Sequence, residues 1–452
     1  MSVLVLRWQQ WLSKAAATDL LRQGLFYGLG IVLMKGISLF MLPVFTAYLV
    51  PAEYGRLEVV LALASIATLL LSAGLSEALY RYAGLAHTEG ERVAVLRDVF
   101  AASCLLGSVG LLLCWLLAKP LAAWLPGQVS GYEVRLLAIA VALEGCIGIP
   151  LAWLRMCDRA ATFFMLTSGK VVLQTSMTWW CLAQGQGVEG VLLAGALSSM
   201  ALAVWLAVDQ VRVYGVALRW QRLPSLLVYG MPMMVSGFAG FMLAGLDRWW
   251  LADQIGEAAM APYALAAKLA LACGILLQPF SLWWYPRRFL LLKQADGLER
   301  NARGAVLGSN LSVLACGVVG LLAPLLILWL TPSDYHQAIH YIPLLVIAMA
   351  LKQVAELLNL GCYVDTHSHT QMLVNIFTAA LAVVGYALWV EPFAVYGVLW
   401  AMLLSYGVRV LLFYGLSQRR LALPYALGSL YACAAFALGL LWLGQWLVRW
   451  WS

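Results

Sequence analysis

Long apolar segments separated by short polar connectors follow one another along the whole chain. A run of about 20 apolar residues is long enough to cross a bilayer as one helix. The pattern therefore predicts an all-α integral membrane protein with about 13 transmembrane helices and no soluble domain. Residues 1–22 are basic and carry two tryptophans, Trp8 and Trp11, so we expect an interfacial helix there. The expected spans are residues 24–49, 58–80, 99–118, 134–154, 162–183, 190–208, 226–252, 262–285, 305–330, 341–363, 371–389, 396–416 and 425–448.

Composition supports a membrane protein and excludes several kinds of enzyme. Hydrophobic residues make up 63% of the 452 residues and charged residues 11%, whereas soluble domains carry about 25% charged residues. The nine cysteines lie mostly in apolar segments without a CxxC pair, so we expect neither a disulfide framework nor a metal site. There is no P-loop, so we expect no ATP hydrolysis. We predict no cofactor and no bound nucleic acid.

The basic residues predict the orientation in the membrane. Cytoplasmic loops of membrane proteins carry an excess of lysine and arginine. With a cytoplasmic N-terminus, the inside connectors hold 18 of the 28 basic residues and the outside connectors hold 4. We therefore expect the N-terminus in the cytoplasm, and an odd helix count then places the C-terminus outside.

Ten ionisable residues fall near the interiors of the predicted spans, where a charged group costs on the order of 3 kcal/mol. They must line a water-filled cavity or pair inside the bundle. Because the cations outnumber the acids, we expect a basic lumen that suits an anionic substrate. The acids are candidates for ion pairing or for proton or sodium coupling. The cations are Lys35, Lys170, Arg248, Lys268, Lys352 and Arg409, and the acids are Glu77, Glu144, Asp247 and Glu356.

Two polar stripes at helical spacing support a hydrophilic lumen. Residues three and four positions apart share one face of a helix, and a polar face within the membrane is expected to point inward. Lys352 and Glu356 are also spaced to neutralise each other. The fifth span carries Thr167, Lys170, Gln174 and Thr178, and the tenth carries Lys352, Glu356, Asn359 and Tyr363.

A weak internal repeat predicts two lobes. Spans one and two align with spans seven and eight at an offset of 206 residues, and glycine and proline interrupt the first and seventh spans. Parallel repeats of this kind are related by an axis along the membrane normal. We expect an N-lobe over residues 23–208, a C-lobe over residues 209–416, and an extra C-terminal helix within 417–452.

Several short motifs resemble those of one family of exporters. The stretch Tyr229-Gly230-Met231-Pro232, the run Leu246-Asp247-Arg248-Trp249-Trp250-Leu251 and the run Ala261-Pro262-Tyr263-Ala264-Leu265-Ala266-Ala267-Lys268 resemble the seventh-to-eighth helix signature of polysaccharide (Wzx-type) flippases. Pro43, Leu49 and Glu53-Tyr54-Gly55 resemble their first-to-second helix signature. These flippases belong to the multidrug/oligosaccharidyl-lipid/polysaccharide (MOP) exporter superfamily. Pro262 departs from the glycine that the family usually has there.

The resemblance implies a MOP/MATE-like fold with two six-helix lobes around a cationic cavity. It also implies flipping of a polyprenyl-pyrophosphate-linked oligosaccharide, the repeat unit of O-antigen, capsule or exopolysaccharide, across a bacterial inner membrane. Expected partners are membrane lipid, a polysaccharide polymerase and a chain-length complex. The six intramembrane cations are the expected substrate contacts.

Four alternatives remain open at this point. A MATE-type drug or cation antiporter uses intramembrane acids, and a peptidoglycan lipid precursor flippase shares a cationic cavity. A membrane polymerase or glycosyltransferase usually needs a sizeable outside loop, and none is predicted here. A scaffold without transport would have no need of so many buried charges.

Overall fold

The computed structural model describes residues 36–451 except 38, 293 and 364–368, and its regular elements there are all helices. The predicted interfacial segment 1–22 and half of the first span lie outside the described residues. The α-helices are α2 (Leu42–Tyr48), α3 (Pro51–Ser72), α4 (Leu75–Leu85), α5 (Glu89–Leu116), α6 (Ala118–Trp124), α7 (Gly131–Ala142), α8 (Glu144–Met156), α9 (Ala160–Ala183), α10 (Gly187–Val213), α11 (Leu223–Ala244), α12 (Leu246–Ile255), α13 (Glu257–Ala270), α14 (Ala272–Leu291), α15 (Gly297–Leu330), α16 (Ala338–Leu357), α17 (His369–Phe393), α18 (Val395–Arg420) and α19 (Gly428–Trp451). Two short 3-10 helices are η1 (Ser333–Tyr335) and η2 (Leu360–Tyr363).

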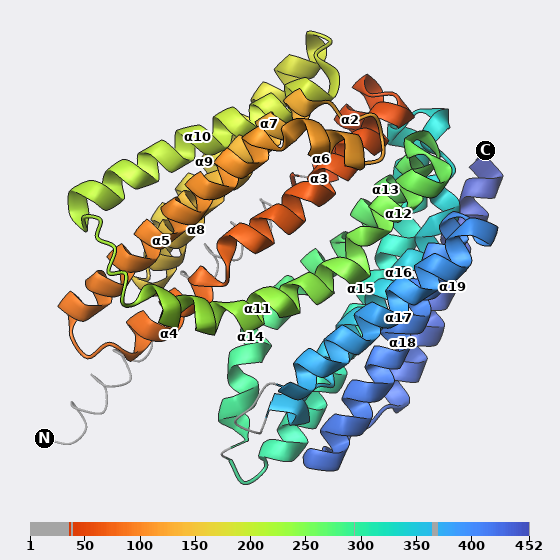
Figure 1. Ribbon diagram of the computed structural model, residues 1–452. Coiled ribbons are helices and arrows are strands. Elements are labelled where there is room, and N and C mark those ends of the chain that lie inside the picture. The colour runs from red at the N-terminus through yellow and green to blue at the C-terminus, as the bar shows by residue number, and fades with distance from the viewer. Residues whose placement is uncertain (1–35, 38, 293, 364–368, 452) are drawn as a thin grey trace, which may run out of the picture.

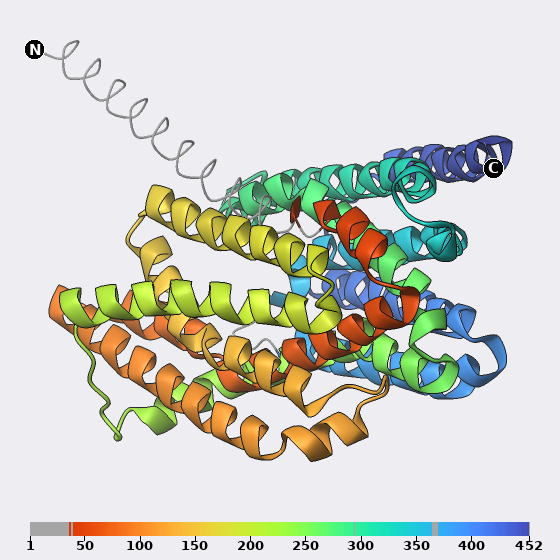
Figure 2. The same cartoon turned by 90° about the horizontal axis from the view of Figure 1, so that it is seen from above.

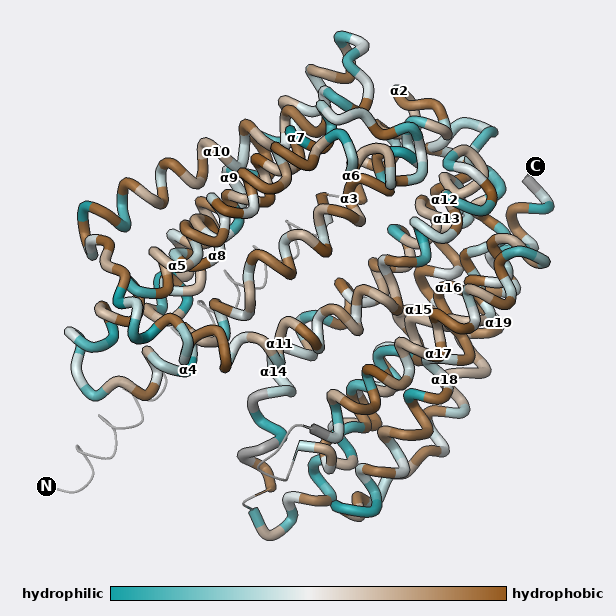
Figure 3. Tube along the Cα trace, in the orientation of Figure 1, coloured by the Kyte–Doolittle hydropathy of each residue, from teal (hydrophilic) through white to brown (hydrophobic). Residues whose placement is uncertain are grey.

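The predicted membrane-spanning architecture is confirmed. Eleven helices among the described residues are long and apolar enough to cross a membrane, and they coincide with eleven of the predicted spans. The predicted fifth span corresponds to α9, which is 24 residues long but more polar. The last helix, α19, is among the eleven. Hydrophilic residues gather at helix ends and connectors, and hydrophobic residues follow the helix middles (Figure 3).

The helices form two groups that diverge toward one end of the bundle (Figures 1 and 2). One group holds α3 to α10, here the N-lobe, and the other holds α12 to α19, here the C-lobe, while α11 runs between them. The α4–α5, α10–α11 and α14–α15 connectors lie at the divergent end, which we call the basic end because these segments carry many of the arginines. The opposite end, with the α2–α3 and α12–α13 connectors, is called the sealed end.

The hydrophobic core explains why the lobes meet at the sealed end. There a single cluster of buried side chains joins both lobes, and it includes Leu57 and Val60 of α3 with Tyr263 and Leu265 of α13. Toward the basic end the core divides into smaller clusters, most of which belong to one lobe. Because burial of apolar surface is the main force for packing, the shared cluster holds the lobes together at this end.

Five predicted spans are interrupted among the described residues, and the sequence analysis anticipated the interruption of the seventh, where α11 ends at Ala244 and α12 begins at Leu246. The fourth span is divided into α7 and α8, and the eighth into α13 and α14. The second span ends as α3 at Ser72 and restarts as α4 at Leu75, because Ala73 and Gly74 both have left-handed backbone conformations (φ 45° and 67°). A side chain at Gly74 would overlap the backbone of Gly230 in α11, so the break lies where the two helices approach closely. The tenth span was expected to continue to residue 363, but α16 ends at Leu357 and η2 follows.

Candidate functional site

Ionisable side chains from both lobes meet near the sealed end in what we call the bridging cluster. Glu58 of α3 lies between Arg248 of α12 and Lys268 of α13. Arg248 Nε is 3.2 Å from Glu58 Oε2, and the Lys268 ammonium pairs with the other carboxylate oxygen. Asp247 Oδ1 is 3.6 Å from Arg248, and its second oxygen accepts a hydrogen bond from the Tyr263 hydroxyl. The formal charges cancel, so this buried cluster joins the lobes without a net charge.

Close helix contacts surround the bridging cluster and close the sealed end. A side chain at Gly55 would overlap the backbone carbonyl of Glu257, so only glycine allows α3 and α13 to approach this closely. The Tyr335 hydroxyl donates to the Leu49 carbonyl at 2.8 Å, and the Tyr335 ring packs edge-on against Tyr54 at 5.8 Å. Burial raises the pKa of Tyr335, which keeps this donor protonated.

A cavity of about 430 Å³ lies between α14 and α16, with Leu39 and Leu271 also in its wall, and we call it the C-terminal cavity. Leu271 lines it one residue after the end of α13, so Lys268 of the bridging cluster lies one turn from its wall. Glu356 Oε1 is 3.9 Å from Arg409 of α18, which partly balances the acid. The cavity therefore combines one lysine and one carboxylate with neutral amide and hydroxyl groups. Its polar lining residues are Gln278, Ser281, Tyr285, Lys352, Gln353 and Glu356.

A second arginine network extends from the C-terminal cavity toward the basic end. Arg288 of α14 is 6% exposed, and its Nη1 donates to Asn359 Oδ1 at 3.1 Å. The Arg288 guanidinium also lies over the rings of Tyr285 and Tyr363, at 4.8 and 4.9 Å from their centroids. Asn359 and Tyr363, predicted to share a stripe with Lys352, instead join Arg288 because α16 ends before them.

The connector between the lobes is held on the N-lobe at the basic end. Asp98 of α5 is 1% exposed and accepts hydrogen bonds from the Arg219 backbone N–H at 3.1 Å and from its Nε at 3.1 Å. Arg222 Nη1 donates to the same carboxylate at 3.3 Å. The Arg81 guanidinium lies 4.5 Å from the ring centroid of Tyr229 in α11. The first turns of α11 therefore contact the N-lobe.

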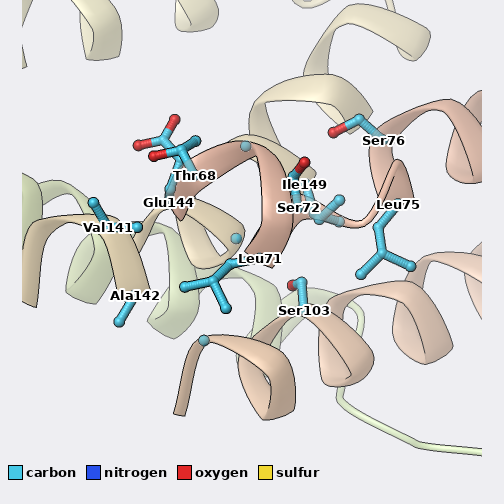
Figure 4. A pocket seen from close by; sticks show the side chains of 13 residues that line it. Thr68, Leu71, Ser72, Leu75, Ser76, Ser103, Val141, Ala142, Glu144 and Ile149 are labelled. Atoms are coloured by element: carbon cyan, nitrogen blue, oxygen red, sulfur yellow. The ribbon is translucent and has the colours of Figure 1, made fainter. Parts of the chain in front are cut away.

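A smaller cavity of about 160 Å³ lies within the N-lobe between α3, α4, α5, α7 and α8, and we call it the N-terminal cavity. Figure 4 shows the carboxylate of Glu144 and the hydroxyls of Thr68, Ser72, Ser76 and Ser103 along the same cavity. None of the described lining residues is basic. The two cavities therefore differ in charge.

Seven of the fourteen predicted site residues fall in or beside three places. Lys35 lies outside the described residues, Glu77 is exposed in the first turn of α4, and Asn359 is buried beside Arg288. The bridging cluster contains Asp247, Arg248 and Lys268. Lys352 and Glu356 line the C-terminal cavity, with Arg409 beside it, and Glu144 lines the N-terminal cavity.

The polar stripe of α9 is only partly as predicted. Thr167 and Thr178 are each 2% exposed, and the Thr167 hydroxyl donates to a carbonyl one turn earlier in its own helix. Gln174 lies against Gly195 of α10. Lys170 is half-buried and lines none of the cavities described above. The helix α9 therefore packs part of this stripe against its neighbours instead of presenting all of it to open space.

The sequence analysis missed three buried charges that organise the site. Glu58 and Arg288 stand next to predicted span ends, where a charged residue is ordinarily solvated, and Asp98 stands just before one. Each is buried because the helix continues past the predicted boundary or because a partner covers it. For Asp98, an acid beside Arg92 and Arg97 was the available signal, since buried charges need partners.

Comparison with known proteins agrees with this architecture. A family profile described as "Polysaccharide biosynthesis protein" matches residues 44–279. This range contains the bridging cluster, the N-terminal cavity and part of the C-terminal cavity. No curated protein sequence matches the chain.

Solved structures of similar fold include several membrane transporters. The structure of lipid II flippase MurJ in an inward closed conformation has a TM-score of 0.70 and 9% identity, covering 94% of this chain and 91% of that one. An inward-facing MATE multidrug resistance transporter of the MOP superfamily has a TM-score of 0.57 and 15% identity, with 89% and 94% coverage. A MOP superfamily transporter from Pyrococcus furiosus has a TM-score of 0.55 and 16% identity, covering 88% of this chain and 95% of that one. These likenesses show the MOP fold.

Proposed function

Because the chain belongs to the polysaccharide biosynthesis family, as a Wzx-type member of the MOP superfamily, we propose that it flips a lipid-linked oligosaccharide between membrane leaflets. The substrate is a polyprenyl-pyrophosphate-linked repeat unit of a surface polymer. The sugar-pyrophosphate headgroup enters the bundle while the polyprenyl tail stays in lipid. The chain's own groups bind and release this headgroup, and no covalent step is required.

The C-terminal cavity is the observation that carries this proposal. Lys352 supplies a cation for a phosphate, and charge-assisted hydrogen bonds are the stronger ones in proteins. Gln278, Ser281 and Gln353 supply amide and hydroxyl groups that match the hydroxyls of sugar rings. Tyr285 adds an aromatic surface at the same wall. A site for an organic cation would instead need unpaired acids, whereas Glu356 lies near Arg409.

The bridging cluster supplies a route for the cycle. With the sealed end closed, the headgroup reaches the C-terminal cavity from the basic end. Lys268 lies one turn beyond this cavity, so a pyrophosphate moving toward the sealed end meets Lys268 and then Arg248. There it competes with Glu58 for both cations. Loss of the Glu58 contacts frees the lobes to separate at the sealed end.

Orientation and location follow from the charge distribution. The excess of basic residues on one set of connectors supports a cytoplasmic basic end, and the proposed polyprenyl-linked substrate implies a bacterial inner membrane. Outward transfer of an anion is favoured by an inside-negative potential, by about 2.3 kcal/mol per net charge per 100 mV. A polysaccharide polymerase and a chain-length complex are the proposed partners on the outer side.

The test is complementation of a strain that lacks the gene. We expect lipid-linked repeat units to accumulate on the cytoplasmic leaflet, and the intact gene to restore polymer at the cell surface. Lys352→Ala should reduce export about 10- to 100-fold, because a hydrogen bond to a charged group contributes about 1.5–3 kcal/mol. Lys119→Ala is the matched control, since Lys119 is exposed on α6 and lines no cavity described here.

The outcomes separate the proposal from its alternatives. Normal leaflet distribution and normal polymer in the deletion strain would overturn it and favour a drug antiporter. Lysis with loss of peptidoglycan would favour a peptidoglycan precursor flippase, a candidate that the fold shared with lipid II flippase MurJ supports. Full export by Lys352→Ala would remove the C-terminal cavity from the substrate path.

A further inference from the structure

An open groove of about 900 Å³ lies at the basic end of the C-lobe, between the first turns of α15 and the connector from α18 to α19 (Figure 1). We call it the α15 groove. It is larger than the two cavities described above, and most of its lining side chains are exposed. It shares no described lining residue with the C-terminal cavity, so it is a separate feature from the proposed substrate path.

The length and charges of α15 put this groove at the membrane surface. At 1.5 Å per residue, the 34 residues of α15 extend about 50 Å, whereas the hydrocarbon core of a bilayer is about 30 Å thick. The charged residues of α15 all lie in its first two turns, of which Arg303 is the last, and the rest of the helix carries none. The first two turns therefore lie among the lipid headgroups, and the helix enters the hydrocarbon after them.

Along α15 the groove presents charged groups first and apolar groups after them. Asp296 and Glu299 come first, and Arg303 lies one turn deeper. Val306 and Leu307 follow on the same wall, and Leu307 is 50% exposed. A phospholipid with an amine headgroup has the same order from water into the membrane, namely an ammonium, a phosphate and then acyl chains.

Two ion pairs at the groove carry both signs and no net charge. Arg303 Nη2 is 2.5 Å from Glu299 Oε1, and Arg300 Nη1 is 3.8 Å from Asp296 Oδ1. All four side chains are more than half exposed, so they keep hydrogen-bonding capacity for a ligand. Balanced charges suit a zwitterion, whereas anionic lipids are attracted by clusters of cations. The ammonium of ethanolamine can donate charge-assisted hydrogen bonds to the two carboxylates, whereas the trimethylammonium of choline has no N–H group.

A polar pair below the charges joins the two walls of the groove. Asn310 Nδ2 of α15 donates to Ser429 Oγ in the first turn of α19 at 3.0 Å. The Ser429 hydroxyl accepts this bond and keeps its own proton for another acceptor, such as the ester carbonyl of a lipid. We infer that the α15 groove binds an ethanolamine phospholipid, with its ammonium at Asp296 and Glu299 and its phosphate at Arg303.

The test is lipid binding to the purified full-length protein in detergent, measured by native mass spectrometry and by the unfolding temperature. Phosphatidylethanolamine, phosphatidylcholine and phosphatidylglycerol with the same acyl chains are added separately. We expect phosphatidylethanolamine to bind several-fold more tightly than the other two and to raise the unfolding temperature most, since a ligand that binds only the folded state stabilises it. Equal binding of all three lipids, or tighter binding of phosphatidylglycerol, would overturn the inference.

Removal of the two carboxylates should reverse the lipid preference. Asp296→Asn/Glu299→Gln leaves Arg300 and Arg303 without these acids. Binding of phosphatidylethanolamine should fall about fivefold, the size expected for two exposed charge contacts, and phosphatidylglycerol should become the preferred lipid. Glu89→Gln/Glu91→Gln is the matched control, because these two acids lie in the first turn of α5 and do not line the groove.

A second variant keeps the inference testable if the double variant does not fold. Ala426 is exposed on the connector and lines the groove, so Ala426→Trp fills the groove without changing its charge. Binding of phosphatidylethanolamine should fall several-fold in a protein that elutes as the wild type does. Unchanged lipid binding in either folded variant would overturn the inference. The measurement needs no transport assay, so its outcome is independent of the proposed function.

Discussion

The two ends of the bundle hold their charges in different ways. At the sealed end the ion pairs cross between lobes, with Glu58 of α3 buried against Arg248 and Lys268 of the C-lobe. At the basic end the contacts of Asp98 fasten the inter-lobe connector to the N-lobe, and those of Arg288 stay within the C-lobe. Opening the sealed end therefore requires breaking buried ion pairs, whereas separating the lobes at the basic end leaves both of these networks intact.

This difference shows what a substrate must supply. Charges left unpaired in a low-dielectric interior are costly, so the sealed end opens readily only if another anion replaces Glu58. The proposed substrate carries its negative charge in a pyrophosphate, which suits the two cations of the bridging cluster. The same fold can thus couple substrate arrival to opening through ordinary ion-pair exchange.

The largest expected effect comes from removing the acid of the bridging cluster. Glu58→Gln leaves Lys268 and Arg248 without this partner, and breaking a buried pair by removing one member destabilises a protein by about 3–5 kcal/mol. We expect a lower unfolding temperature in detergent, measured by tryptophan fluorescence. The double variant Glu58→Gln/Lys268→Met should recover part of the loss. A single variant as stable as the wild type would show that the cluster does not hold the lobes together.

A smaller effect is expected from loosening the sealed end without changing charge. Gly55→Leu places a side chain against the Glu257 backbone, and overpacking costs about 1–3 kcal/mol. The variant should label faster than the wild type with a water-soluble cysteine reagent at a cysteine introduced at Val60, which is buried in the shared core. Gly84→Leu is the control, because a side chain there meets no neighbouring atom. Equal labelling rates would contradict a tight α3–α13 contact.

The sequence predicts the fold better than it predicts the site. Hydropathy identifies the spans because a bilayer demands about 20 apolar residues per helix, and α19 coincides with the expected last span. The breaks at Ala73 and Leu358 escape this criterion, since a broken helix keeps the same mean hydropathy. Lys352 was found because a charge in the middle of a span is conspicuous.

Pairing across the chain is the part that sequence spacing does not reveal. Glu58 and Arg248 are 190 residues apart and belong to different lobes. Neighbours along a helix suggested a pair between Lys352 and Glu356, and the structure adds Arg409 of α18, whose guanidinium is 3.9 Å from Glu356 Oε1. Such contacts depend on how the lobes pack, so local periodicity alone identifies candidate charges without their partners.

The smallest expected effect lies at the basic end. Asp98→Asn removes the charge that holds Arg219 and Arg222, but these arginines are 48% and 40% exposed and regain water when released. Exposed pairs contribute about 0–1 kcal/mol, so the unfolding temperature should fall far less than in Glu58→Gln. The connector should nevertheless be cut faster by trypsin at Arg219, because its backbone N–H loses a charged acceptor. A loss of stability equal to that of Glu58→Gln would erase the contrast between the two ends and place a second lock at the basic end.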